Sequence, residues 1–138
     1  MSDMNIIETV KSLNLPTGHY VVFGSAPMAV RGLRESSDID LLVDKGLFEE
    51  LRKLGWEETK LPSGDSLLSK DNIEVFDGWN VGGYHPDTED LISRADMFEE
   101  VPFATLADVL EWKEASGRPK DLVDVEILRN FLSEARPL

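Results

Sequence analysis

The chain has 138 residues, which is enough for one domain with one hydrophobic core. Its 27 acidic and 14 basic residues give a formal net charge of −13, and this field repels polyanions, so extended binding to DNA or RNA is not expected. The chain contains no apolar run of about 18 residues, no recognisable secretion signal and no cysteine. We therefore expect a cytoplasmic protein without a membrane span, a disulfide or a cysteine–zinc site.

The first half of the chain is expected to alternate between helices and strands. In order, the expected elements are a helix ending near residue 15, a strand at 20–23, a helix holding residues 28–33, a strand at 39–43, a helix over 46–54 and strands at 55–60, 66–70 and 73–76. Apolar residues at near-helical spacing indicate the helices, and short apolar runs bounded by turn residues indicate the strands.

The second half is expected to be mainly helical. Its expected elements are a surface loop over 78–89, a short edge strand within 95–103, a helix over 106–115 that Thr105 caps, and a last helix from Pro119. In the last helix we expect the following side chains on the core face: Leu122, Val125, Leu128, Phe131 and Leu132. The alternation of helices and strands predicts a mixed α/β fold. We expect a single domain over 1–138, with a core at about 19–100 and a helical segment at about 105–135.

Two aspartates at the start of an apolar strand are the strongest chemical feature. Asp38 and Asp40 flank Ile39, and residues two apart in a strand point to the same face, roughly 6.6 Å apart. A divalent cation would offset their repulsion, and oxygen ligands favour magnesium or manganese. A solvated strand end is the alternative for such a pair in isolation.

The pair lies downstream of a Gly24-Ser25 turn that joins a buried strand to a helix. Glycine at such a turn allows a phosphate to approach the backbone closely, and the serine hydroxyl adds a donor. A plain strand–helix turn would use the same residues. The turn indicates a phosphate-binding site only in combination with the two aspartates that follow it.

A third acid lies in a later strand. Glu74, between Ile73 and Val75, faces away from its apolar neighbours, so it could join Asp38 and Asp40 if the two strands are adjacent. It could then hold a metal ion and accept a proton. Asp77, at the end of the same strand, is the competing candidate.

These residues together resemble a known signature. Phe23-Gly24-Ser25, twelve further residues and then Asp38-Ile39-Asp40-Leu41 resemble the signature of the DNA polymerase beta-like nucleotidyltransferase superfamily. The residues between them resemble the small stand-alone branch, which includes toxins of abortive-infection systems and enzymes that adenylylate antibiotics. The tail at 113–124, a lysine followed by Arg-Pro-Lys-Asp, is similar to the closing segment of that branch. The resemblance spans roughly 19–132.

The resemblance implies a nucleotidyltransferase fold, with a central mixed sheet, helices packed mainly on one face and two C-terminal helices. It implies that Asp38, Asp40 and Glu74 bind two Mg²⁺ ions, with Mn²⁺ as an alternative. The residues expected to bind the nucleotide are Gly24, Ser25, Arg34 and Lys120. The roles of Lys113 and Asp121 stay open.

The implied activity is transfer of a nucleoside monophosphate from an NTP, which we expect to be ATP, to a hydroxyl acceptor with release of pyrophosphate. The acceptor could be a small molecule, a protein or an RNA end, and the charge of −13 favours the first two. Because little sequence remains outside the catalytic module, a homodimer or a protein partner could complete the acceptor site. The alternative is a non-catalytic, antitoxin-like partner that keeps the fold. Trp79 is expected to be the tryptophan best placed to stack on a base.

Overall fold

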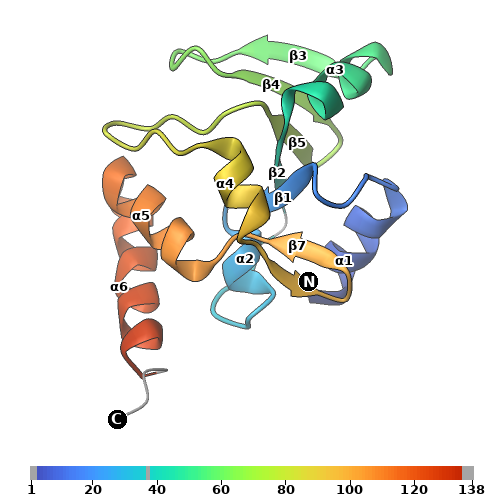
Figure 1. The fold of residues 1–138 in the computed structure, drawn as a ribbon. Coiled ribbons are helices and arrows are strands. Elements are labelled where there is room, and N and C mark those ends of the chain that lie inside the picture. The colour runs from blue at the N-terminus through green and yellow to red at the C-terminus, as the bar shows by residue number, and fades with distance from the viewer. Residues whose placement is uncertain (1–2, 37, 135–138) are drawn as a thin grey trace.

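The computed structural model describes residues 3–36 and 38–134. Its helices and strands are α1 (Asp3–Ser12), β1 (Tyr20–Phe23), α2 (Ala26–Ala29), β2 (Ile39–Val43), α3 (Lys45–Lys53), β3 (Glu57–Lys60), β4 (Ser66–Lys70), β5 (Ile73–Phe76), α4 (Thr88–Ser93), β6 (Asp96–Phe98), β7 (Val101–Phe103), α5 (Leu106–Ser116) and α6 (Pro119–Glu134) (Figure 1). The mixed α/β class expected from the sequence, with two C-terminal helices, is confirmed. No helix among the described residues is long and apolar enough to cross a membrane.

The strands form one mixed sheet in the order β3-β4-β5-β2-β1-β7-β6. Within it β2 is antiparallel to β1 and parallel to β5. The register of the parallel pair places Asp40 directly opposite Glu74. The adjacency of these two strands, on which the expected grouping of acids depended, is therefore present.

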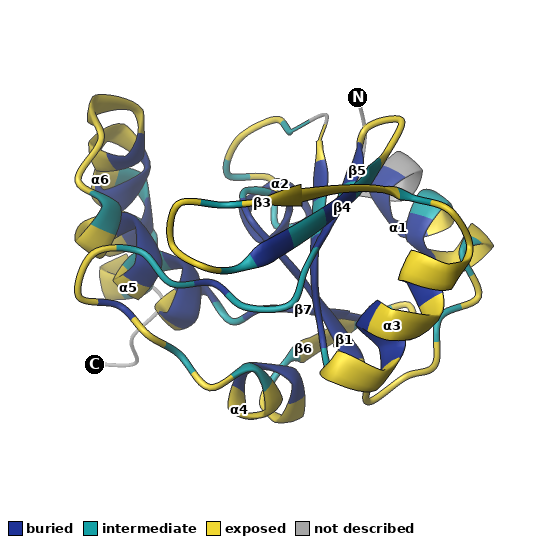
Figure 2. Cartoon of the chain, turned by 90° about the horizontal axis from the view of Figure 1, so that it is seen from above, coloured by how far each residue is buried: buried dark blue, intermediate teal, exposed yellow. Residues whose placement is uncertain are grey.

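Both faces of the sheet are covered, because the strands at its centre are apolar on both sides. Val22, Leu41 and Val43 belong to a core shared with α1 and α3. Val21 and Leu42, which alternate with them, belong to a second core shared with α4, α5 and α6. Figure 2 shows the buried central strands between these two groups of helices. The expectation that helices pack mainly on one face is therefore wrong, since a strand that is buried on both sides needs a cover on both sides.

Capping side chains and a glycine determine where the helices begin and end. The Asp44 carboxylate accepts a hydrogen bond from the amide of Leu47 at the start of α3. The Thr105 hydroxyl accepts one from the amide of Asp108 at the start of α5, as its capping pattern predicts. Gly117 ends α5 with a φ of 64°, a conformation that glycine adopts without strain.

The segment expected as one edge strand at 95–103 is a hairpin instead. Strands β6 and β7 pair in antiparallel register, with the turn residues Glu99 and Glu100 at φ values of 48° and 71°. Of these two strands only β6 lies at an edge of the sheet, because β7 inserts between β6 and β1. Pro102 therefore lies within β7, opposite Met97, and does not end a strand.

Three further expectations are corrected by burial and by helix boundaries. The loop expected over 78–89 carries two buried side chains, Trp79 and Tyr84, and its end already belongs to α4. The helix expected over 28–33 is the short α2, which turns follow. In α6, Leu122 is 52% exposed and does not face the core, whereas Leu128 is fully buried.

Candidate functional site

A pocket of about 900 Å³ lies at one end of the sheet. Its lining side chains come from the turn after β1, the segment before β2, β2 itself, the β3–β4 turn, β5, the loop after β5, and the α5–α6 region. Of the residues expected to be functional, all except Gly24 line this pocket, and they are Ser25, Arg34, Asp38, Asp40, Glu74 and Lys120. This volume falls within the range of about 300–1,000 Å³ that is usual for small-molecule sites.

Asp40 and Glu74 form a carboxyl pair in the wall of the pocket. Burial raises the pKa of Asp40 to about 7, and the negative charges of Glu74 and Asp38 together with a hydrogen bond to Glu74 add to this rise. The charge of Lys113 opposes the shift. Asp40 is therefore partly protonated near neutral pH, at a place where positive charge is needed to keep it ionised.

Gly24 makes room for the Asp40 carboxylate. Its φ is +68°, and a Cβ placed on it would lie 2.3 Å from Oδ2 of Asp40. Glycine was expected here so that a phosphate could approach the backbone. The structure adds a second reason: the carboxylate of β2 packs directly against the turn after β1.

Asp38 is exposed and lies just before β2, two residues from Asp40. Among the described residues, no group of three or more His, Cys, Asp or Glu side chains is arranged so that it could hold a metal ion as it stands. Asp40 is instead hydrogen-bonded to Glu74. The donor chemistry nevertheless fits a hard divalent cation, because all three candidates offer carboxylate oxygens and Asp40 lacks a counter-ion at contact distance among the described residues.

Asp77, the competing third acid, lies elsewhere. Its carboxylate accepts a hydrogen bond of 2.8 Å from the amide of Ser66, and it lines a smaller hollow beside Asp44 and Asp87. It is not among the residues that line the main pocket. The structure therefore brings Glu74, and not Asp77, to Asp40.

Lys113 is the functional candidate whose place the sequence did not predict. The residue is 1% exposed, and its ammonium group lies 3.2 Å from Asp121 and 2.9 Å from Asp124. It also donates to the hydroxyl of Ser25 at 3.3 Å and lies over the Trp112 ring. The lysine therefore ties both C-terminal helices to the turn after β1. Its only sequence signal is the resemblance of the tail.

Asp121 completes this buried group. Burial raises its pKa, but hydrogen bonds from Ser116, Arg118 and Lys113, with the charge of Lys113, outweigh burial and hold the pKa below its ordinary value. The carboxylate is therefore held in its ionised form.

The other two basic candidates, Arg34 and Lys120, differ in whether an acid already pairs with their charge. Arg34 forms an ion pair of 2.5 Å with Asp124, so its charge is already matched. Lys120 is exposed at the pocket and, among the described residues, makes no ion pair or hydrogen bond. Arg31, three residues before Arg34, pairs with Asp96 and does not line the pocket. Lys120 is thus the cation most available to a ligand.

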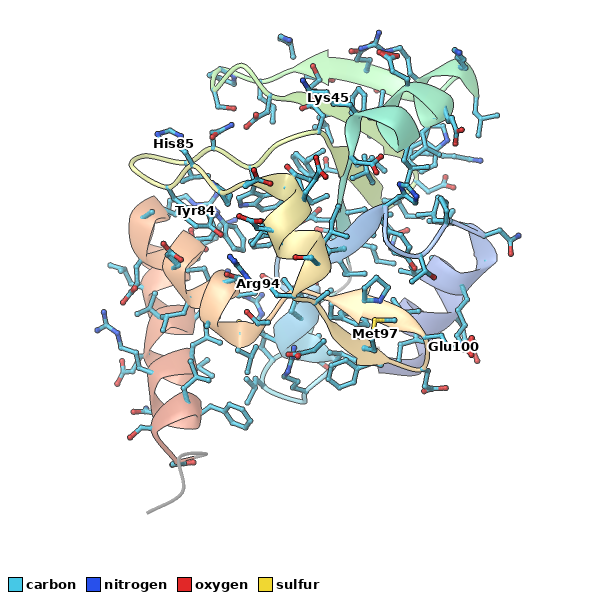
Figure 3. All side chains as sticks on the ribbon, viewed as in Figure 1. Lys45, Tyr84, His85, Arg94, Met97 and Glu100 are labelled. Carbon is cyan, nitrogen blue, oxygen red and sulfur yellow. The ribbon has the colours of Figure 1, made fainter. Side chains whose placement is uncertain are left out.

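Trp79 occupies a different place from the one expected for a base-stacking residue. It is 8% exposed and stacks on Phe23 with ring centroids 4.7 Å apart, while Trp112 meets it edge-on. It contributes to the wall of the pocket but its face is already covered. In the same loop, Tyr84 lies on the side facing α5 and His85 on the outer side (Figure 3).

No protein-family model and no curated protein sequence matches the chain. The structure is similar to the crystal structure of ANT(2")-Ia in complex with adenylyl-2"-tobramycin. The similarity has a TM-score of 0.46 and 16% sequence identity, and it covers 92% of this chain and 85% of that chain. It concerns the general path of the backbone only.

Proposed function

We propose that the protein is a metal-dependent nucleotidyltransferase that moves a nucleoside monophosphate from an NTP, ATP in the first instance, to a hydroxyl acceptor. The observation that carries the proposal is the placement of Asp40 opposite Glu74 on adjacent parallel strands, with Asp38 two residues away, in the wall of one pocket. Basic side chains of the α5–α6 region line the same pocket. Transfer of a phosphoryl group needs carboxylates that hold metal ions, and it needs positively charged groups that bind the phosphates.

Asp38, Asp40 and Glu74 would hold magnesium, or manganese, in this site. When bound, the ions supply positive charge at the acceptor oxygen and at the leaving pyrophosphate. Any proton on Asp40 would have to leave first, since a ligating carboxylate must be ionised. Gly24 supports this arrangement, because its missing Cβ leaves the space that Asp40 occupies.

The chain's own side chains would bind the nucleotide and move the proton. Lys113 donates to the oxygen of Ser25, so the proton of that hydroxyl is free to be donated to a phosphate oxygen. Lys120 would add a charge that no protein acid already matches. As the acceptor oxygen bonds to the α-phosphorus and the bond to pyrophosphate breaks, the acceptor proton would pass to Glu74.

The first test is binding of magnesium and a non-hydrolysable ATP analogue, measured by calorimetry. Asp38→Asn and Asp40→Asn should abolish it while the fold is kept, because each change removes one ligand charge. Asp77→Asn is the matched control and should bind like the parent, since Asp77 lies outside the pocket. Binding as tight as the parent's in either of the first two variants contradicts the assignment.

Glu74 separates the chemical role from the binding role. If Glu74 takes the proton, Glu74→Gln should lower the rate of pyrophosphate release by about 10²–10⁴ with a smaller effect on nucleotide binding. If it serves as a ligand as well, metal binding weakens too. A parent that does not bind magnesium and the nucleotide at all would favour the non-catalytic, antitoxin-like alternative.

A further inference from the structure

Positive charge is distributed unevenly around the pocket. Four basic side chains line it: Arg34, Lys113, Arg118 and Lys120. The last three belong to α5, α6 and the turn between them, and we call this side the tail wall. The β3–β4 turn at 61–65 and the loop at 78–81 line the pocket as well, but they contain no basic residue. We call these two segments the clamp wall.

Asp65 joins the two segments of the clamp wall. Its Oδ2 accepts a hydrogen bond of 2.9 Å from the amide of Asn80, and its Oδ1 accepts one of 2.8 Å from the side-chain nitrogen of Asn80. The Ser63 hydroxyl donates to the same carboxylate at 2.9 Å. The turn of the hairpin is thus held against the loop by one carboxylate that accepts three hydrogen bonds.

Gly78 permits this close contact. A Cβ placed on Gly78 would lie 2.4 Å from Oδ1 of Asp65, a separation that real Cβ atoms do not show. Gly78 follows β5 almost directly, and β5 carries Glu74. The position of the clamp wall is therefore set relative to the acid that would accept the proton.

We propose that the clamp wall holds the hydroxyl acceptor, that Asp65 is its positioning residue, and that the acceptor carries no phosphate group. This assignment rests on the proposed function. The strongly anionic triphosphate belongs beside the tail wall, because Lys120 there carries a charge that no acid among the described residues pairs with. A second polyanion would meet the Asp65 carboxylate and no cation on the clamp wall. That wall offers polar and apolar groups, among them Ser63, Leu61 and Val81, next to the strand of Glu74.

The assignment is tested with Asp65→Asn. The new side chain has one acceptor oxygen in place of two, so it cannot accept from both the backbone and the side-chain nitrogen of Asn80. Asn80→Asp combined with Asp65→Asn exchanges the two groups and restores donor and acceptor. Calorimetry with magnesium and the non-hydrolysable ATP analogue should give the same affinity for Asp65→Asn as for the parent. Lys120→Gln, on the tail wall, should bind several-fold more weakly. Equal weakening in Asp65→Asn and Lys120→Gln would place the nucleotide on the clamp wall and overturn the proposal.

Glycerol and water serve as competing acceptor probes in a single reaction with ATP. The ratio of glycerol adduct to free AMP, measured by mass spectrometry, does not depend on how much enzyme is folded or how well it binds ATP. Asp65→Asn should lower this ratio several-fold, and the exchanged pair should restore it. Glycerol 3-phosphate should be a poorer acceptor than glycerol.

The outcomes separate the two levels of the proposal. An unchanged product ratio in Asp65→Asn, or a preference for glycerol 3-phosphate, overturns the clamp-wall assignment and leaves the transferase standing. A parent that neither binds the nucleotide nor forms AMP or an adduct refutes the proposed function, and the assignment falls with it.

Discussion

Two groups of charged side chains line the same pocket and differ in how their charges are matched. In the carboxylate group, Asp38, Asp40 and Glu74, like charges meet, and burial together with these charges raises the pKa of Asp40 to about 7. In the lysine group, Lys113 lies between Asp121 and Asp124, so buried charges of opposite sign are paired. The charges of the lysine group are balanced within the protein itself. The carboxylate group, in contrast, needs a bound cation to balance its negative charge. Structural and ligand-binding charges can thus be told apart by their balance.

Removal of the buried lysine should have the largest effect on stability. Lys113→Met leaves Asp121 and Asp124 without their central partner, and breaking a buried ion pair in this way costs about 3–5 kcal/mol. Urea unfolding measures the loss. Lys120→Met is the control, because an exposed and unpaired lysine should change stability by no more than about 0.5 kcal/mol. Equal free energies of unfolding for the two variants would show that the ion pairs of Lys113 do not stabilise the fold.

The carboxylate group should respond in the opposite direction when an acid is removed. The pKa of Asp40 is raised from 3.8 to about 7, so the folded chain holds a proton that the unfolded chain releases. The stability contributed by this proton is fully present below the unfolded pKa of 3.8 and is lost as pH rises through about 7.

Asp40→Asn cannot lose that proton, so the metal-free variant should become more stable than the parent as pH rises. The expected advantage is near zero at about pH 4 and reaches at most about 4 kcal/mol at about pH 8. Urea unfolding in the presence of a chelator measures it, and magnesium should reduce the difference by stabilising the parent. An advantage that stays constant across this range would contradict the link between Asp40 and charge repulsion.

The smallest expected effect concerns the turn that supports the carboxylate group. Gly24→Ala places a methyl group where Asp40 Oδ2 lies and forces alanine into a left-handed conformation, which costs about 1–2 kcal/mol. We expect a modest loss in thermal stability together with a clear loss of magnesium–nucleotide affinity. Gly32→Ala is the control, because Gly32 also has a positive φ but meets nothing within 4 Å. Equal nucleotide affinity in the two variants would argue against the role of Gly24.

The pairing of Asp40 with Glu74 was predictable from the sequence in part, because the side of a strand on which a residue lies is set locally. Alternation around Glu74 indicated which acid turns toward Asp40, whereas Asp38 lies just before β2, outside the strand geometry that was expected to set its side. Only the adjacency of β2 and β5 had to be assumed. The exposed Leu122 shows the limit of periodicity, since an apolar residue in a helix can lie on the solvent side.

The lysine group and the clamp wall could not be predicted because they join segments that are distant in sequence. Ser25 and Lys113 are 88 residues apart, and Asp65 and Asn80 are 15 apart across a hairpin and a loop. No local pattern reports that a lysine in α5 will be buried or that a turn aspartate will accept from a loop amide. The β6–β7 hairpin was missed for a similar reason, because the position of β7 next to β1 is set by pairing and not by its own residues.

The long separation of Ser25 and Lys113 also orders events during synthesis. The three acids and the strands β1, β2 and β5 lie within the first 76 residues, so they can emerge from the ribosome and pair while the tail is still being made. The lysine that binds the Ser25 hydroxyl arrives only with α5, and its two acid partners arrive with α6. A nascent chain therefore has its carboxylates before its tail wall, and that side of the pocket can form only after α5 and α6 have been made.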